Sequence, residues 1–213
     1  MTASVLVAVA VHLAVLFDSC PPLVIVAKEI VVENGKMSFK GHGSGVVVDP
    51  RGYVVTCLHC VGRRDEVAAG FRLGLPLPAT VVHRQPEDDL ALLKIEDGGR
   101  WRYPFLRPSS DLPRVTDRVH VWGHPHEFPF TLSSGTVTAI NRGLKMPDGD
   151  PLSGLIQVDA AINSGCSGGA LLNAKGELLG IPVAIREGAQ GIGFAVPARA
   201  VRRLMENLPP VED

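Results

Sequence analysis

The sequence predicts an all-β protein. Short runs rich in Val, Ile and Leu follow one another, separated by clusters of Gly, Pro, Asn and Asp. The 23 glycines among 213 residues supply many turns. Helical periodicity is confined to one segment near the carboxyl end. Many short strands with closely spaced turns favour a β-sandwich or β-barrels over a doubly wound α/β sheet.

The expected strands are placed by these runs. Asp49-Pro50-Arg51-Gly52 is a turn between two of them, because proline and glycine occupy positions that turn geometry favours. The irregular segment 100–113 carries three prolines and is a natural connector between two halves. We expect strands within residues 23–27, 45–48, 54–56, 79–83, 90–95, 118–122, 135–140, 155–158, 170–172, 178–184 and 193–196.

The tail is the one segment with helical character. Ala198, Val201, Leu204 and Met205 recur at three- and four-residue steps with charged residues between them. Pro209-Pro210 then ends the pattern. We expect a helix over 197–208 that caps the fold.

Composition excludes some functions. Hydrophobic residues make up 46% of the chain and charged residues 20%, as in ordinary folded proteins. The net charge is −1, with no clustered basic stripe, so we expect no nucleic-acid partner.

Residues 3–17 form an apolar stretch interrupted only by His12. Its length suits the core of a secretion signal or an anchor better than a full membrane span. No Lys or Arg precedes it and no small-residue cleavage site follows, so a buried element of the fold is the alternative. We treat 1–20 as a separate apolar segment, with membrane association through 3–17 and an exported location as expectations.

Cys57 and Cys60 form a C-x-x-C pair around Leu58-His59. A redox role expects the pair to open a helix in a thioredoxin-like unit, but the surroundings are strand-like. A zinc site needs two further ligands, which the sequence does not offer at suitable spacing. We therefore expect packed, small apolar side chains, with no metal and no cofactor; the disulfide status stays open.

The strongest chemical signal is Gly165-Cys166-Ser167-Gly168-Gly169. A nucleophilic serine needs an exposed hydroxyl beside backbone N–H donors for the developing oxyanion. Glycines on both sides permit the tight turn that directs successive amides into one place. On its own, however, the segment could be an ordinary glycine-rich turn.

Two further motifs complete the set. A strand, 53–57, leads directly into His59, which suits a general base on a rigid element. Asp89 opens the apolar run 90–95, where a partly buried carboxylate can orient an imidazole. The order His59, Asp89, Ser167, with steps of 30 and 78 residues, is that of chymotrypsin-type serine peptidases. We expect these three to form a catalytic triad.

These motifs resemble the HtrA/Deg branch of trypsin-like serine peptidases over roughly residues 41–208. The similarity lies in 43–48 and 52–56 before His59, in 89–94, in 134–140, in the nucleophile block 159–169 and in 191–197. It implies two six-stranded antiparallel β-barrels of the chymotrypsin type, with the site between them. The implied protease domain spans 21–213, with a first barrel at about 21–105 and a second at about 114–197.

The resemblance also implies function. It implies a serine endopeptidase acting on unfolded or misfolded polypeptides in protein quality control, assembled as a homotrimer. The oxyanion hole would be the backbone of Gly165, Cys166 and Ser167. The alternative is a peptide-binding or holdase module on the same fold that is inactive, or latent until it is activated allosterically.

The sequence departs from the family in several places. Cysteines stand at 57 and 166 where the family has Asn, and at 60 where it has Val. Cys166 raises the question of a cysteine nucleophile, but the paired glycines follow Ser167 and assign the attack to the serine. The sequence ends at Asp213, so we expect the protease domain without a PDZ domain.

The segments expected to line the first substrate pocket carry no acid at its base. They contribute Ala161, Ile162, Val183 and Ala184, and Asp159 lies further back. We therefore expect cleavage after small or medium aliphatic residues.

Overall fold

The computed structural model describes residues 22–33, 36–72, 75–126, 128–145, 151–185 and 190–210. The apolar segment 3–17 and Cys20 lie outside this part of the chain. Within it, no helix is both long and apolar enough to cross a membrane.

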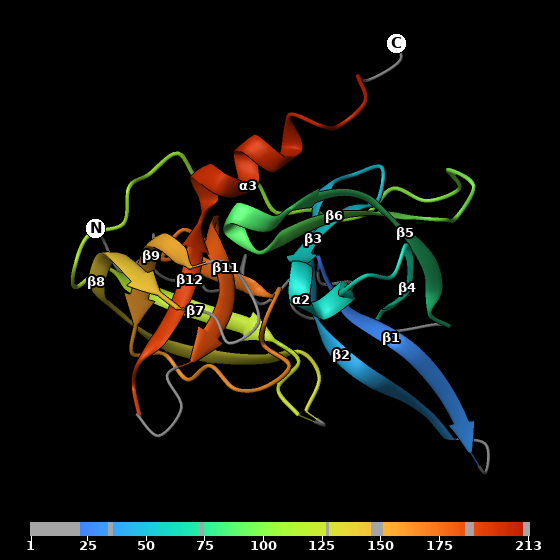
Figure 1. Cartoon of the computed structure of the whole chain (residues 1–213), viewed down its shortest axis with the longest axis horizontal. Coiled ribbons are helices and arrows are strands. Elements are labelled where there is room, and N and C mark those ends of the chain that lie inside the picture. The colour runs from blue at the N-terminus through green and yellow to red at the C-terminus, as the bar shows by residue number, and fades with distance from the viewer. Residues whose placement is uncertain are drawn as a thin grey trace, which may run out of the picture.

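The first half of the chain forms a closed antiparallel barrel, on the right in Figure 1. Its strands are ordered β1-β2-β3-β6-β5-β4, and pairing of β1 with β4 closes it. The short helix α2 (Leu58–Val61) follows β3, and a 3-10 turn, η1 (Pro86–Asp88), precedes β6. The strands are β1 (Leu23–Glu33), β2 (Lys36–Asp49), β3 (Tyr53–Cys57), β4 (Glu66–Gly70), β5 (Leu77–Gln85) and β6 (Leu90–Ile95).

The second half forms another closed antiparallel barrel, on the left in Figure 1. Its strands are ordered β10-β11-β12-β9-β8-β7, and pairing of β10 with β7 closes it. The prediction of two six-stranded barrels is therefore confirmed. The strands are β7 (Arg118–Gly123), β8 (Thr131–Leu144), β9 (Leu152–Val158), β10 (Ala170–Asn173), β11 (Leu178–Ile185) and β12 (Gly193–Pro197).

Strand β3 shows how the two barrels share one apolar interior. All five of its residues are buried. Val54 belongs to the core of the first barrel, whereas Val55 and Cys57 belong to a cluster that also contains residues of the second barrel. Successive strand residues point to opposite faces, so a strand buried on both faces reads as a continuous apolar run. The carboxyl end of β3, where His59 follows, is thus held at the junction of the barrels.

Helix α3 (Ala198–Met205) lies above both barrels in Figure 1. Its apolar face, including Val201 and Leu204, is fully buried in the shared cluster. On its exposed side, Arg203 reaches the first barrel and pairs with Asp88 at 2.6 Å. The helix therefore connects the second barrel, which it follows in the chain, with the turn that precedes Asp89.

Candidate active site

His59 lies on α2, immediately after β3. Its Nδ1 is 2.5 Å from Asp89 Oδ2, and its backbone N–H donates to Asp89 Oδ1 at 3.0 Å. An ionised carboxylate only accepts hydrogen bonds, so we assign the Nδ1 proton to the ring. Nε2 is then the nitrogen available for proton transfer. The ring is partly open, with 42% of the side chain exposed.

Asp89 is held in place by its own backbone as well as by its side chain. It follows η1 and adopts a left-handed conformation, with φ 52°, which aspartate tolerates better than most residues. Its carbonyl accepts a hydrogen bond from Leu58 N at 2.8 Å. The turn before β6 and the turn after β3 are thus tied together, and the two side chains are aligned.

The nucleophile loop requires two of its glycines. Gly165 has φ +96°, and a Cβ there would lie 2.2 Å from His124 O. Gly168 has φ +84°, and a Cβ there would lie 2.2 Å from Ser44 O. Left-handed conformations and contacts of this kind exclude side chains at both positions. The sequence Gly-x-Ser-Gly thus folds into a tight turn against the first barrel.

Ser167 lies at the centre of this turn, against the first barrel. Its carbonyl accepts from Ser44 N at 2.8 Å and lies 3.6 Å from Cys60 Sγ, next to His59 in sequence. Its hydroxyl donates to Val183 O at 3.2 Å. Among the described residues, this hydroxyl makes no hydrogen bond with His59.

The amides of the loop differ in their hydrogen bonds. Cys166 N donates to Asn163 O at 2.9 Å, and Gly168 N donates to Pro182 O at 2.9 Å. The Cys166 amide is therefore committed to its own turn. The candidate oxyanion donors are the amides of Gly165 and Ser167.

Cys166 is 3% exposed and packs in the core of the second barrel. Burial raises the pKa of its thiol. A buried thiol held in its neutral form is a poor nucleophile. The geometry therefore favours the serine over its cysteine neighbour as the attacking group.

His59 and Cys60 influence each other's charge. Burial disfavours the imidazolium, but the hydrogen bond with Asp89 and the neighbouring Cys60 outweigh it and raise the pKa of His59 to about 10. The hydrogen bond with Cys57, together with the neighbouring His59, outweighs the cost of burial and lowers the pKa of Cys60 to about 5. Burial raises the pKa of the fully buried Cys57 thiol well above its usual value. The pKa shifts of His59 and Cys60 depend on each other, because a charged imidazole and a charged thiol stabilise one another.

Ser44 is a positioning residue for which the sequence predicted no role. Its buried hydroxyl donates to Gly165 O at 2.7 Å and accepts from His124 N at 3.0 Å. Its carbonyl accepts from Thr56 Oγ1 at 2.6 Å. Ser44 thereby ties the nucleophile loop to β2 and β3. The motif Gly43-Ser44-Gly45 carried the signal, but only tertiary contacts show what the serine bonds.

The residues expected to line the substrate pocket are placed as follows. Ile162 is buried against Gly193, where an added Cβ would lie 2.6 Å from its Cδ1. Val183 is also buried, whereas Ala161 is exposed. The side chain of Ala184 lies outside the described part of the structure. Asp159 accepts from Thr136 N at 2.5 Å and from Thr136 Oγ1 at 3.0 Å, so its carboxylate is occupied by β8.

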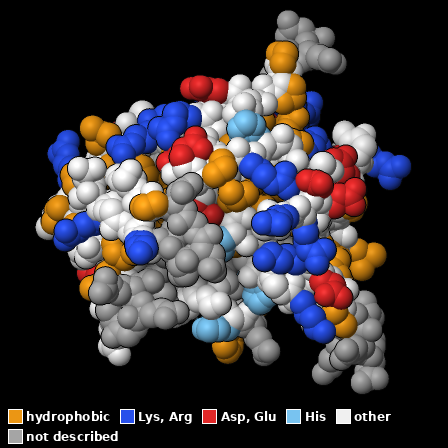
Figure 2. Space-filling view, viewed as in Figure 1, with side chains coloured by type: hydrophobic (Ala, Val, Ile, Leu, Met, Phe, Trp, Pro, Cys, Tyr) orange, Lys and Arg blue, Asp and Glu red, His pale blue; other side chains and the backbone are white. Residues whose placement is uncertain are grey.

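A hollow of about 570 Å³ adjoins the nucleophile loop and is lined by Gly41, His42, His126, Phe128 and Ser164. His126 N donates to Ser164 O at 2.9 Å, so the hollow begins three residues before Ser167. Figure 2 shows basic and acidic side chains interspersed on one face, with histidines exposed toward its middle.

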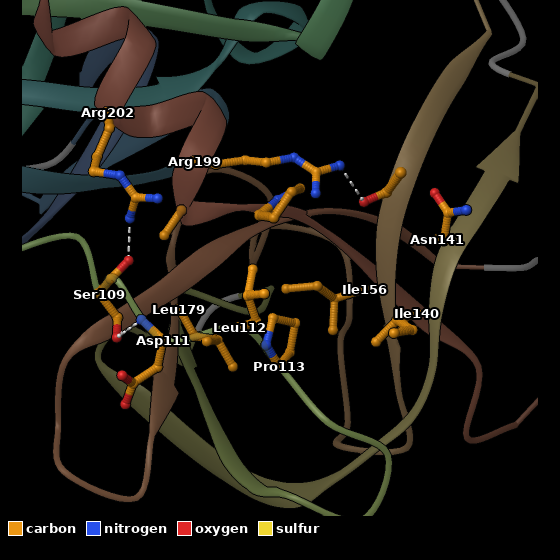
Figure 3. Close-up of a pocket in the computed structure, with 13 residues that line it drawn as sticks. Ser109, Asp111, Leu112, Pro113, Ile140, Asn141, Ile156, Leu179, Arg199 and Arg202 are labelled. Carbon is orange, nitrogen blue, oxygen red and sulfur yellow. Dashed lines mark hydrogen bonds between the residues drawn. The ribbon is translucent and has the colours of Figure 1, made fainter.

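A second hollow, of about 230 Å³, lies beneath the start of α3 (Figure 3). Arg202 donates to Ser109 O, and Arg199 donates to Gly154 O at 3.4 Å. Ile156 and Leu179 line the apolar part of the hollow. None of the predicted catalytic residues contributes to it.

Comparison with known proteins gives a direct match to a family. The family model described as trypsin-like peptidase domain matches residues 43–181. The chain belongs to the trypsin-like peptidases. The predicted HtrA/Deg resemblance is confirmed by the relatives below.

The periplasmic pH-dependent serine endoprotease DegQ of Escherichia coli is 37% identical over 80% of this chain and 38% of its own length. Protease Do-like 5, chloroplastic, of Arabidopsis thaliana is 36% identical over 83% of this chain and 59% of its own length. This chain therefore spans less than two thirds of the length of either relative. Among solved structures, the HtrA-type protease AlgW with decapeptide superposes with a TM-score of 0.74 at 28% identity, covering 92% of this chain and 66% of that one.

Proposed function

We propose that the protein is a serine endopeptidase. The observation that carries the proposal is the His59–Asp89 pair beside a glycine-bounded loop that presents Ser167. Ser167 attacks a peptide carbonyl while His59 accepts its proton and then returns it to the leaving amine. Asp89 orients the imidazole and stabilises its cation. The amides of Gly165 and Ser167 stabilise the oxyanion, and water releases the acyl group.

The nucleophile is tested by comparing Ser167→Ala with Cys166→Ala in casein cleavage. Ser167→Ala is expected to remove catalysis, by on the order of 10⁶-fold in kcat. Cys166→Ala is the matched control, because its side chain points into the core; it should keep cleaving. Cleavage by folded Ser167→Ala at the native rate would overturn the proposal.

The substrates are proposed to be unfolded polypeptides cut after small or medium aliphatic residues. Ile162 fills space beside Gly193, and Asp159 is held by Thr136. We expect a first substrate pocket bounded by these residues to select small apolar side chains. A peptide library should show cleavage after Ala, Val or similar residues, and Ile162→Ala should shift preference to larger ones. Dominant cleavage after Lys or Arg would contradict this specificity.

The names of the relatives indicate where this protein works in the cell. DegQ is named periplasmic and Protease Do-like 5 chloroplastic, which favours an exported location for this chain as well. Protein quality control and assembly as a homotrimer are proposed from the resemblance to the HtrA/Deg branch, not from these names. Sedimentation of the purified protein tests the assembly.

A second candidate is the same enzyme in a latent state. It is favoured by the Ser167 hydroxyl, which donates to Val183 O and must turn toward His59 before attack. A fluorophosphonate probe should then label the protein slowly alone and faster with a bound peptide. Equal labelling rates with and without peptide would exclude latency, and a protein that never reacts would instead be a binding module.

A further inference from the structure

The proposed proteolytic mechanism makes no use of Cys57 and Cys60. In the structure, Sγ of each cysteine and one ring nitrogen of His59 all lie within 4.8 Å of one another. We propose that these three side chains form a binding site for a zinc-type divalent ion, and that the bound ion switches the protease off.

The local fold brings the three donors together. Cys57 ends β3 as the N-cap of α2, and Cys60 is three residues later, so both lie on the same side of this single turn. His59 stands between them, and Asp89 fixes its ring. Cys57 Sγ lies 3.3 Å from Pro182 O, and Cys60 Sγ lies 3.6 Å from Ser167 O. Both sulfurs therefore face the second barrel, at the junction where the proposed catalysis occurs.

The donor set suits zinc in number and type. Tetrahedral zinc with sulfur bonds of about 2.3 Å and nitrogen bonds of about 2.0–2.1 Å separates its ligands by roughly 3.5–3.8 Å. Side-chain rotations on the order of 1 Å therefore close the present arrangement around an ion. Two thiolates and an imidazole favour zinc-type ions over Mg²⁺ or Ca²⁺, which prefer oxygen ligands. Two cysteines, one histidine and an open fourth position form an established zinc ligand set.

The surroundings also fit a metal-bound histidine. Asp89 accepts from Nδ1 of His59, and a carboxylate in this position orients zinc-binding histidines elsewhere. The cysteines are 0% and 5% exposed, so the partly open ring of His59 is the way in for an ion. Burial of the two thiols is explained by packing alone, but packing does not require both to converge on the imidazole.

The consequence for activity rests on the proposed function. An ion on Nε2 takes the lone pair that would accept the Ser167 proton. An ion on Nδ1 displaces Asp89, which orients the ring. Either geometry removes the general base, so zinc binding and proteolysis exclude each other.

Binding is measured first without catalysis, in reduced, chelator-treated protein carrying Ser167→Ala. Cobalt(II) is added as a spectroscopic substitute for zinc, and thiolate-to-cobalt charge-transfer absorption reports two sulfur ligands. Zinc should displace the cobalt and abolish the absorption. Cys57→Ala, Cys60→Val and His59→Ala, each in the same background, should weaken binding on the order of a hundredfold or more. Cys166→Ala removes a buried thiol outside the cluster and should leave binding unchanged.

Several results would overturn the metal site. These are no charge-transfer absorption in reduced protein, the same absorption in Cys57→Ala with Cys60→Val, or loss of binding in Cys166→Ala alone. A Cys57–Cys60 disulfide that persists under reduction would also overturn the site, because it would leave no free thiolates to bind an ion. Circular dichroism of each variant separates lost ligands from lost folding.

Activity is the second measurement, made with Ser167 intact. Zinc should inhibit casein cleavage in the native protein, and a chelator should restore it. The ratio of activities with and without zinc should approach one in Cys60→Val. Equal inhibition in that variant would contradict the proposed switch. Cobalt binding without any proteolysis would instead disprove the peptidase and leave the metal site standing.

Discussion

Asp89 does two separate things for His59. One carboxylate oxygen accepts from the ring and the other from the backbone N–H, at 2.5 and 3.0 Å. The ring contact fixes the tautomer of the imidazole. The backbone contact fixes the position of the His59 main chain from which the ring extends. The neighbouring Asp88 makes quite different contacts, with Gln85 and Arg203.

Replacing Asp89 by Asn should lower kcat by about 10⁴, because an amide can stabilise the wrong imidazole tautomer. Steady-state cleavage of a chromogenic peptide measures the loss. Asp88→Asn is the matched control and should retain most activity. Equal losses in the two variants would mean that the Asp89–His59 pair is not catalytic.

His124 provides a test through pH. It is 1% exposed, and burial lowers its pKa from 6.5 to about 3. The unfolded chain then takes up a proton near pH 6.5, whereas the folded chain does so only near pH 3. The stabilisation is therefore complete above pH 6.5 and is lost as pH falls toward 3.

As the pH is lowered across this range, His124 alone should decrease the free energy of unfolding by about 1.4 kcal/mol per pH unit. His124→Asn keeps an acceptor for Phe130 N and removes the titration. Urea unfolding at several pH values should show a smaller slope in the variant. An unchanged slope would show that His124 does not titrate differently on folding.

At the level of elements, α3 joins parts of the molecule that are far apart in sequence. Leu204 is fully buried in the cluster shared by the barrels, and Arg203 pairs with Asp88, next to Asp89 in the sequence. The ion pair is partly exposed and contributes little by itself. Burial of the apolar face is what holds the helix.

Leu204→Ala should destabilise the protein by about 2–5 kcal/mol, because it removes buried methyl groups and leaves a cavity. Urea unfolding measures the change. The exposed Glu206 on the same segment is the control, and its replacement by Ala should change stability by less than about 0.5 kcal/mol. A small effect at Leu204 would mean that α3 packs more loosely than described.

Sequence patterns were sufficient to predict most elements but not all of them. Each predicted run falls on a strand, and the terminal helix is α3. Strand β4 was missed because Glu66–Gly70 is short and rich in alanine, and pairing with β1 and β5 decides its conformation. Strand β8 is longer than the predicted 135–140, because its polar ends are held by β7 and β9.

The candidate site was predictable to a similar degree. The order of motifs is enough to expect His59 beside Asp89, and the structure joins them by hydrogen bonds. The direction of the Ser167 hydroxyl, the bonds of Ser44 and the convergence of Cys57 and Cys60 on His59 depend on contacts between the barrels. Such contacts leave no periodic signal in the sequence.

At the scale of the whole molecule, each barrel supplies what the other lacks. The first contributes His59 and Asp89, and the second contributes Ser167 with its amides. Ser44 N bonds Ser167 O, and Gly168 N bonds Pro182 O, so the loop is held by both barrels. We propose that this junction activates one serine, Ser167.

Fluorophosphonate labelling followed by peptide mapping shows whether Ser167 is the activated serine. The reduced, metal-free protein is treated with the probe in the presence of denatured casein, and His59→Ala is treated in parallel. An adduct is expected on Ser167 in the native protein, with strongly reduced labelling in the variant. No adduct in the native protein, an adduct on another residue, or equal labelling of both proteins would contradict the proposal.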